Sequence, residues 1–290
     1  MNSAIMVLCT NYDFLKVMMQ NLPDELKSVK FFIVLEDRLQ RTPSKRNVQL
    51  MMEEFKLKYK VLRSEDIIKW FKVYTKLDVP FIDNYTMGLN ILSQAYFFKE
   101  TKFDGVLFVD DDVIFSEGTL DILKNKESQM KYYRLSAGPA TKEGLSVEGA
   151  RVYDELAKTT GFRGTYEDYI KNHISSGNRF LSRNDFKVDI YIKMLIRFFK
   201  SELFEEKWAY YKETGKGKMA AFFLDEKFET MAYHRLGNLN FGLEPLVKLE
   251  VSKPEKLSNK KLINKPIWHN ATSSHKYKTL EILRERGEII

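Results

Sequence analysis

The sequence of 290 residues contains one cysteine, Cys9. A single thiol excludes an internal disulfide and fits a reducing compartment such as the cytosol. We expect Cys9 to be buried and chemically inert. Long hydrophobic runs are missing as well, since "AIMVLC", residues 4–9, is far shorter than the roughly 20 apolar residues of a membrane-spanning helix. The run also lacks the basic flank and cleavage site of a signal peptide. We therefore predict a cytoplasmic protein with no integral membrane segment.

The motifs of several common enzyme classes are also absent. The sequence has no P-loop GxxxxGK[ST], no GxGxxG after its first apolar run, no GxSxG elbow, and no CxxC or HExxH metal motif. The stretch "TGKGK", residues 214–218, is a Gly/Lys turn after a helical segment and does not match a Walker loop. Internal repeats and low-complexity linkers are missing too, which favours one continuous globular domain.

Positive charge is in excess. The chain has 47 Lys and Arg against 40 Asp and Glu, a net charge of +7 and a pI near 9.1. Such a balance favours contact with a polyanion, either nucleic acid or an acidic membrane surface. A lysine-rich solvated surface without any partner explains it equally well. Because no basic block is longer than a few residues, a basic face would have to be assembled by the fold.

Hydrophobic patterning predicts the fold class. In the N-terminal half, short apolar runs alternate with segments of helical spacing. Strand–helix–strand units of this length build a parallel sheet with helices on both faces, so we predict a single large α/β domain of Rossmann type. Ligands bind such sheets at the carboxyl ends of the strands. The predicted strands are residues 4–9, 30–36, 59–64 and 105–109, and the predicted helices are residues 13–22, 48–55 and 86–99.

The second half is less regular. Residues 138–164 are rich in Gly, Thr and Glu and poorly periodic, and we interpret them as an excursion facing an acceptor. Residues 173–186 resemble a loop leading into a strand, and residues 188–213 predict one long amphipathic helix. Residues 221–238 predict a short apolar run, two acids and a helix ended by Gly237.

The stretch "GVLFVDDDVIF", residues 105–115, joins an apolar strand to three consecutive acids. In an extended chain Asp110 and Asp112 point to one side and Asp111 to the other. Two carboxylates on one side of a strand end form a hard-oxygen site suited to Mn²⁺ or Mg²⁺. The alternative is a solvated acidic loop that stabilises the N-terminus of the following helix.

A longer stretch, "NYTMGLNILSQAYFFKETKFDGVLFVDDDVIFSEGTLDIL", resembles the central block of GT-A-fold glycosyltransferases. In that family a helix with a Gly-x-x-Asn-like element precedes an apolar strand and a DxD motif; here the helix carries Gly88 and Asn90. The resemblance implies a GT-A-like fold and a nucleotide-diphosphate sugar as donor, with a UDP-sugar favoured. It implies that Asp112 ligates the Mn²⁺ or Mg²⁺ that bridges the diphosphate. Asp110 would contact the ribose or the ion, and Asp111 is the variable middle position of the donor site.

The same resemblance divides the domain into two halves. Residues 1–130 would form the nucleotide-sugar-binding half, ending in the DxD motif. Residues 131–290 would form the acceptor-binding half, with a C-terminal segment for metal and diphosphate.

A second matching stretch, "FFLDEKFETMAYHRLGN", resembles the ED…R…G region of many inverting members. By that match Asp225 or Glu226 is the general base that removes the proton of the acceptor hydroxyl. An acid placed near a helix N-terminus by the helix dipole is the alternative. A retaining enzyme would need neither residue as a base.

The third matching stretch is "PIWHNATSSHKYK", residues 266–278. Members of the family often add a C-terminal histidine to the metal ligands, which implies a role for His269, with His275 as the runner-up. Lys276 or Lys278 would bind diphosphate oxygens.

Other donor contacts are implied by position in the family order. Tyr12 would stack on the base, although a core or surface tyrosine explains it nearly as well. Glu36 and Asp37 depart from the commoner acid pair of the family, which puts the role of that strand end in doubt. The residues implied in donor binding, besides Asp110 and Asp111, are Thr10, Asn11, Tyr12, Asp66, Asn90, Ser176, Gly177, Asn178 and Lys276.

The acceptor is inferred from charge and from the expected absence of a membrane segment. Double-stranded DNA with hydroxymethylated bases is our first hypothesis, as used by phage DNA-base glycosyltransferases in the host cytoplasm. Basic and aromatic residues in 151–171 and 179–187 would form the DNA face. A cell-surface glycan or a lipid-linked precursor is the rival acceptor. A sugar nucleotidyltransferase and a non-catalytic nucleic-acid-binding protein are the rival classes.

Overall fold

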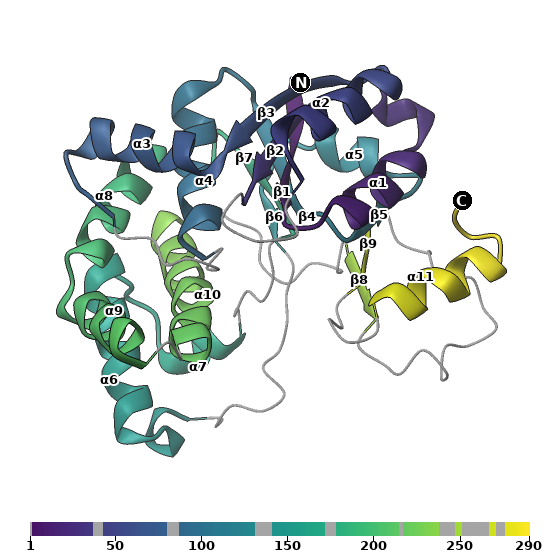
Figure 1. The fold of residues 1–290 in the computed structure, drawn as a ribbon. Coiled ribbons are helices and arrows are strands. Elements are labelled where there is room, and N and C mark those ends of the chain that lie inside the picture. The colour runs from purple at the N-terminus through teal and green to yellow at the C-terminus, as the bar shows by residue number, and fades with distance from the viewer. Residues whose placement is uncertain are drawn as a thin grey trace.

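The computed structural model describes residues 2–36, 43–79, 87–130, 141–171, 178–214, 217–237, 247–250, 267–270 and 276–290. Its main sheet has the strand order β3-β2-β1-β4-β7-β6, in which β1 to β4 are parallel and β7 is antiparallel to both β4 and β6. The predicted fold class, a mostly parallel sheet flanked by helices in one domain, is confirmed (Figure 1). The strands are β1 Ser3–Cys9, β2 Lys30–Leu35, β3 Lys58–Arg63, β4 Gly105–Asp110, β6 Gln129–Met130 and β7 Arg179–Ser182.

Both faces of the sheet are apolar. Successive side chains of the buried strands are apolar, and they point alternately to the two faces. Met6 and Phe108 belong to one buried cluster, and Val7 and Val109 belong to the other. Cys9 is fully buried in the second cluster, as expected, and burial raises the pKa of its thiol.

Helices cover both clusters (Figure 1). The first cluster packs against α3 Ser64–Thr75, α4 Met87–Glu100, α6 Val147–Thr160, α7 Tyr166–Lys171, α8 Val188–Phe199, α9 Glu202–Thr214 and α10 Gly217–Leu236. The second packs against α1 Tyr12–Gln20, α2 Lys45–Glu54 and α5 Thr119–Lys124. Short 3-10 turns lie at η1 Asp24–Leu26 and η2 Lys142–Gly144. No helix in these ranges combines the length and apolar character that crossing a membrane would require.

A smaller sheet has the order β5-β9-β8, formed by β5 Val113–Phe115, β8 Val247–Glu250 and β9 Ile267–Asn270. Strand β9 is antiparallel to β5 and parallel to β8. The last helix, α11 Lys276–Glu285, packs through Leu280 and Leu283 against Phe14 and Val17 of α1. The C-terminal segments therefore lie beside the strand that follows the three acids.

Three local predictions in the second half differ from the structure. The excursion contains helix α6, capped at its start by Ser146 and ended by Gly161 in the left-handed conformation, at φ +69°. The long helix predicted over 188–213 is two helices. The helical conformation is interrupted at residues 200–201, where the Ser201 hydroxyl accepts a hydrogen bond from the Phe204 N–H. Helix α10 begins at Gly217, so Asp225 and Glu226 lie inside it and not at its N-terminus.

Candidate functional site

The three acids lie at the carboxyl end of β4, in the middle of the main sheet. Asp110 is the last residue of the strand, and Asp111 and Asp112 form the turn before β5. Asp110 is half-buried, whereas Asp111 and Asp112 are only 4% and 6% exposed. Strand geometry ends at Asp110, so the predicted alternation of side chains does not extend to Asp112. The position itself, at the ligand-binding edge of a parallel sheet, is the one predicted.

Asp111 joins the acid turn to the end of β1. Its Oδ2 accepts from the backbone N–H groups of Thr10, at 2.5 Å, and Asn11, at 2.6 Å, and from the Thr10 hydroxyl at 3.1 Å. Burial and the adjacent charge of Asp112 raise the pKa of Asp111 to about 7, while the two backbone hydrogen bonds act in the opposite direction. Asp111 therefore fixes the turn that presents Asp110 and Asp112.

Asn178 holds the other side of Asp110. Its Oδ1 accepts from the backbone N–H of Asp110 at 3.1 Å, and the residue is 1% exposed. The Nδ2 of Asn178 has no acceptor among the described residues. A buried amide donor without an acceptor costs about 1–3 kcal/mol, so this group is suited to a ligand oxygen.

Behind Asn178 lies a buried ion pair that the sequence did not predict. Arg179 Nη2 lies 2.7 Å from Glu229 Oε1 of α10, and both side chains are buried. The same nitrogen donates to Asn90 Oδ1 at 2.9 Å, and Gln94 Nε2 donates to Glu229 Oε1 at 2.5 Å. The hydroxyl of Tyr233 donates to Gln94 Oε1. Burial disfavours the guanidinium charge, but Glu229 together with Tyr233, Tyr191 and Asp110 outweighs that effect and keeps the pKa of Arg179 above its ordinary value.

This network places Asn90 beside the acids. Asn90, Ser93 and Asp110 line one small pocket together with apolar residues of β1, β2 and β4. The implied donor contact of Asn90 stays a prediction, and its side-chain oxygen is engaged with Arg179.

The C-terminal segments reach the same edge. In the antiparallel register of β5 and β9, Val113 lies opposite His269, so the backbone of His269 is next to the residue that follows Asp112. At the start of α11, the Tyr277 hydroxyl accepts from Asn11 Nδ2 at 3.2 Å, which places the backbone of Lys276 near the end of β1. The side chains of His269 and Lys276 lie outside the described part of the structure. Among the side chains that are described, no group of three or more His, Cys, Asp or Glu is positioned to hold a metal ion.

The structure describes the side chains of only some of the other predicted site residues. The carboxylate of Asp66 accepts from the Arg63 N–H at 3.0 Å at the start of α3, beyond the far edge strand β3. Tyr12 is half-buried at the first position of α1. The backbones of Asp225 and Glu226 are helical, but their side chains are not described. Asp37, Ser176, Gly177 and His275 lie outside the described residues, and Lys278 is exposed on α11.

Comparison with known proteins finds no matching family model and no matching curated protein. Similar solved structures include the glucosyl-3-phosphoglycerate synthase of Mycobacterium tuberculosis, with 12% identity, 68% of this chain and 65% of that chain covered, and a TM-score of 0.34. Another structure of that synthase, in complex with Mn²⁺ and UDP-glucose, has 13% identity over 68% and 64% of the two chains and a TM-score of 0.33.

The glycosyltransferase GlyE of Streptococcus pneumoniae is similar over 99% of this chain and 64% of its own, with 9% identity and a TM-score of 0.41. The chain thus spans less than two thirds of the length of each of these proteins. At these scores no activity or ligand is transferred from them to this chain.

Proposed function

We propose that the protein is a divalent-metal-dependent glycosyltransferase that moves a sugar from a nucleotide-diphosphate donor to a hydroxyl acceptor. The observation that carries the proposal is the placement of Asp110 and Asp112 at the carboxyl end of β4, the edge at which α/β sheets bind their ligands. Asp111 is engaged with Thr10 and Asn11, and the proposal assigns the cation to its two neighbours because they supply two carboxylates at this strand end.

The residues present fit a Mn²⁺ or Mg²⁺ ion. Two adjacent carboxylates supply the hard oxygen ligands these ions prefer. His269 is the proposed third ligand, supported by the register that sets its backbone opposite Val113. When bound, the ion neutralises charge on the departing diphosphate.

The residues of the chain bind and orient the donor. Asn178 offers a buried amide N–H beside Asp110, suited to a hydroxyl or phosphate oxygen of the donor. Lys276 is proposed to bind the diphosphate, because the hydrogen bond between Asn11 and the adjacent Tyr277 places its backbone near the end of β1. The proposed donor is a UDP-sugar. Tyr12 and Asp66 remain proposed contacts of the base or ribose.

Helix α10 is proposed to carry the general base. Asp225 and Glu226 lie one turn before Glu229, whose ion pair with Arg179 fixes α10 against β7. Since Asn178 precedes Arg179 and bonds to Asp110, the helix and the acid turn are held by neighbouring residues. Asp225 or Glu226 would take the proton of the acceptor hydroxyl as that hydroxyl attacks the anomeric carbon.

The acceptor we propose is a hydroxymethylated base in double-stranded DNA, supported by the net charge of +7. A screen of nucleotide sugars for Mn²⁺-dependent hydrolysis, with and without hydroxymethylated DNA, tests donor and acceptor together. We expect sugar transfer to the modified DNA and no transfer to unmodified DNA. A turnover rate that is unchanged by DNA and increased by glycans would contradict the proposed acceptor. A rate of donor hydrolysis that is unchanged in Asp112→Asn would contradict the proposed metal site.

A further inference from the structure

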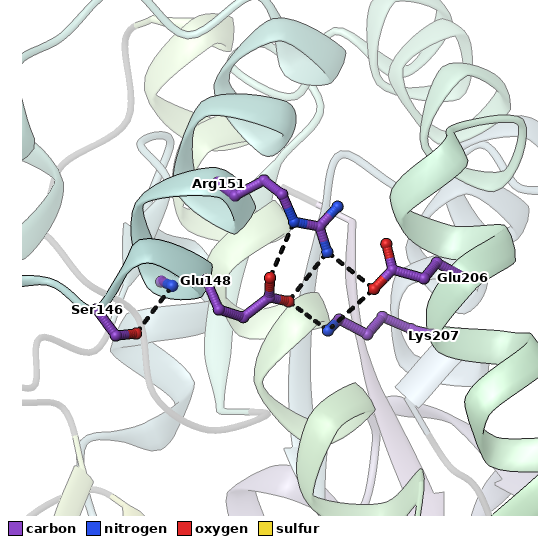
Figure 2. A network of polar contacts seen from close by, with 6 residues as sticks. Ser146, Glu148, Arg151, Glu206 and Lys207 are labelled. Atoms are coloured by element: carbon purple, nitrogen blue, oxygen red, sulfur yellow. Dashed lines mark hydrogen bonds and ion pairs between the residues drawn. The ribbon is translucent and has the colours of Figure 1, made fainter.

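Some cations of the helical region are paired with carboxylates, whereas four others form no ion pair with the described residues. In the paired group, Arg151 lies 2.9 Å from a carboxylate oxygen of Glu148 and 2.9 Å from one of Glu206 (Figure 2). Lys207 joins the same network through Glu148 at 2.5 Å. The positive charges of Arg151 and Lys207 are neutralised by the two glutamates, so this part of the predicted DNA face contributes little net positive charge to DNA binding.

Two arginines of the other predicted segment are also engaged within the fold. Arg179 is buried against Glu229, and Arg183 donates to the backbone carbonyls of Phe98, Thr101 and Phe103 at 2.7–2.8 Å. These residues hold β7 in place and do not present their guanidinium groups to a partner. The basic face inferred from residues 179–187 is therefore not formed by these arginines.

A second group of cations lines a pocket between α6, α8 and α10, which pack against one another. Arg163 follows the end of α6, Lys193 and Arg197 lie one turn apart on α8, and Arg235 is near the end of α10. All four side chains are exposed. None of them forms an ion pair with a carboxylate of the described ranges, in contrast to the cations of Figure 2.

The chemistry of this pocket fits the phosphates of a polyanion. Four positive charges converge on it, while its remaining lining residues are small or aliphatic, Ile190 and Met194 among them. The lining includes no aromatic ring to stack on a base and no carboxylate to bind sugar hydroxyls. Charge without base-reading groups is the pattern of sequence-independent contact with a phosphate backbone.

We propose that Arg163, Lys193, Arg197 and Arg235 form a docking site for the phosphodiester backbone of duplex DNA, separate from the acids of β4. Four charges exceed what one small phosphate needs, and they match several phosphodiesters, each carrying one negative charge. Lys193 and Arg197, four residues or about 6 Å apart along α8, contact different phosphates of the strand. The site deepens the proposed function by holding a DNA acceptor, but it binds without donor or turnover.

The test measures the affinity of the full-length protein for a short labelled duplex by fluorescence anisotropy at several salt concentrations. In Lys193→Ala/Arg197→Ala, the slope of log K against log [salt] should become shallower by about 1.8, since each phosphate contact contributes about 0.9. Between about 50 and 200 mM salt, the variant should then lose roughly tenfold less affinity than the wild type. Thermal unfolding of the variant should match that of the wild type, because both side chains are exposed.

The matched control is Lys142→Ala/Lys158→Ala, which removes two cations that are already paired with Asp154 and Glu155. This control should keep the wild-type slope. Equal slopes in all three proteins, or no duplex binding by the wild type, would overturn the proposal. Displacement of the duplex by inorganic phosphate at constant ionic strength would also overturn it, because that result defines a site for a small phosphate. None of these outcomes depends on the glycosyltransferase activity.

Discussion

Arg179 of β7 and Glu229 of α10 form a buried ion pair, with 2.7 Å between Nη2 and Oε1. The pair joins the strand beside Asp110 to the helix that carries the proposed base. Asn178, the residue before Arg179, bonds to the backbone of Asp110 at 3.1 Å. A displacement of α10 would therefore be transmitted to the acid turn through two adjacent residues.

Removal of Glu229 should destabilise the fold strongly. Glu229→Ala leaves a fully buried guanidinium without its counter-charge, and breaking one partner of such a pair costs about 3–5 kcal/mol. Urea unfolding followed by circular dichroism measures the change. The control is Asp78→Ala, which breaks an exposed pair with Lys72 and should cost less than about 1 kcal/mol. Similar losses in the two variants would show that the buried pair does not hold α10.

Asn178 should contribute to donor binding. Asn178→Ala removes the bond to the Asp110 backbone and the buried Nδ2 donor, so we expect donor affinity to fall about tenfold, or about 1.4 kcal/mol. Isothermal titration with UDP-sugar and Mn²⁺ measures it. Asn184→Ala, at an exposed position of the turn that follows β7, is the control and should bind as the wild type does. Unchanged affinity in a folded Asn178→Ala protein would remove Asn178 from the site.

The network of Glu148 should make stability depend on acidic pH. Hydrogen bonds from Arg151 and Lys207 lower the pKa of Glu148 to about 2 (Figure 2). Because the folded pKa lies below the unfolded value of about 4.3, the stabilisation is present above pH 4.3 and is lost as the pH falls towards 2.

The melting temperature of Glu148→Gln measures this effect. The variant should melt below the wild type at neutral pH, by a small margin because the side chains are partly exposed, and the difference should shrink as the pH falls from about 5 to 2. A difference in melting temperature that stays constant across this pH range would contradict a stabilising role of the ionised Glu148.

The part of the fold that could be predicted from sequence is the part set by local pattern. Apolar runs such as residues 105–109 define buried strands, and the acids that follow them fall at the strand ends whatever the rest of the chain does. The role of Asp111 could not be predicted, because its partners Thr10 and Asn11 lie about a hundred residues away.

The Arg179–Glu229 pair was missed for a related reason. An arginine at the start of "RFLS" and a glutamate in "KFETMAY" look like surface residues until β7 and α10 pack together. The signal in the sequence was a charged residue directly before the apolar residues Phe180 and Leu181 of the strand. Helix α6 was missed because its Gly, Thr and Glu content obscured an apolar stripe made by Val152, Tyr153 and Leu156.

The Mn²⁺ affinity of the protein tests the central claim most directly, which is that Asp110 and Asp112 hold a divalent ion for the donor diphosphate. Titration of the protein with Mn²⁺ in the presence of UDP, followed by electron paramagnetic resonance, should give saturable binding. Asp112→Asn, which keeps the shape of the side chain, should weaken it by about 100-fold or more, because a neutral amide replaces a charged ligand. Asp121→Asn, an exposed acid of α5 beside Lys124, should bind as the wild type does. Equal Mn²⁺ affinity in the wild type and Asp112→Asn would contradict the account.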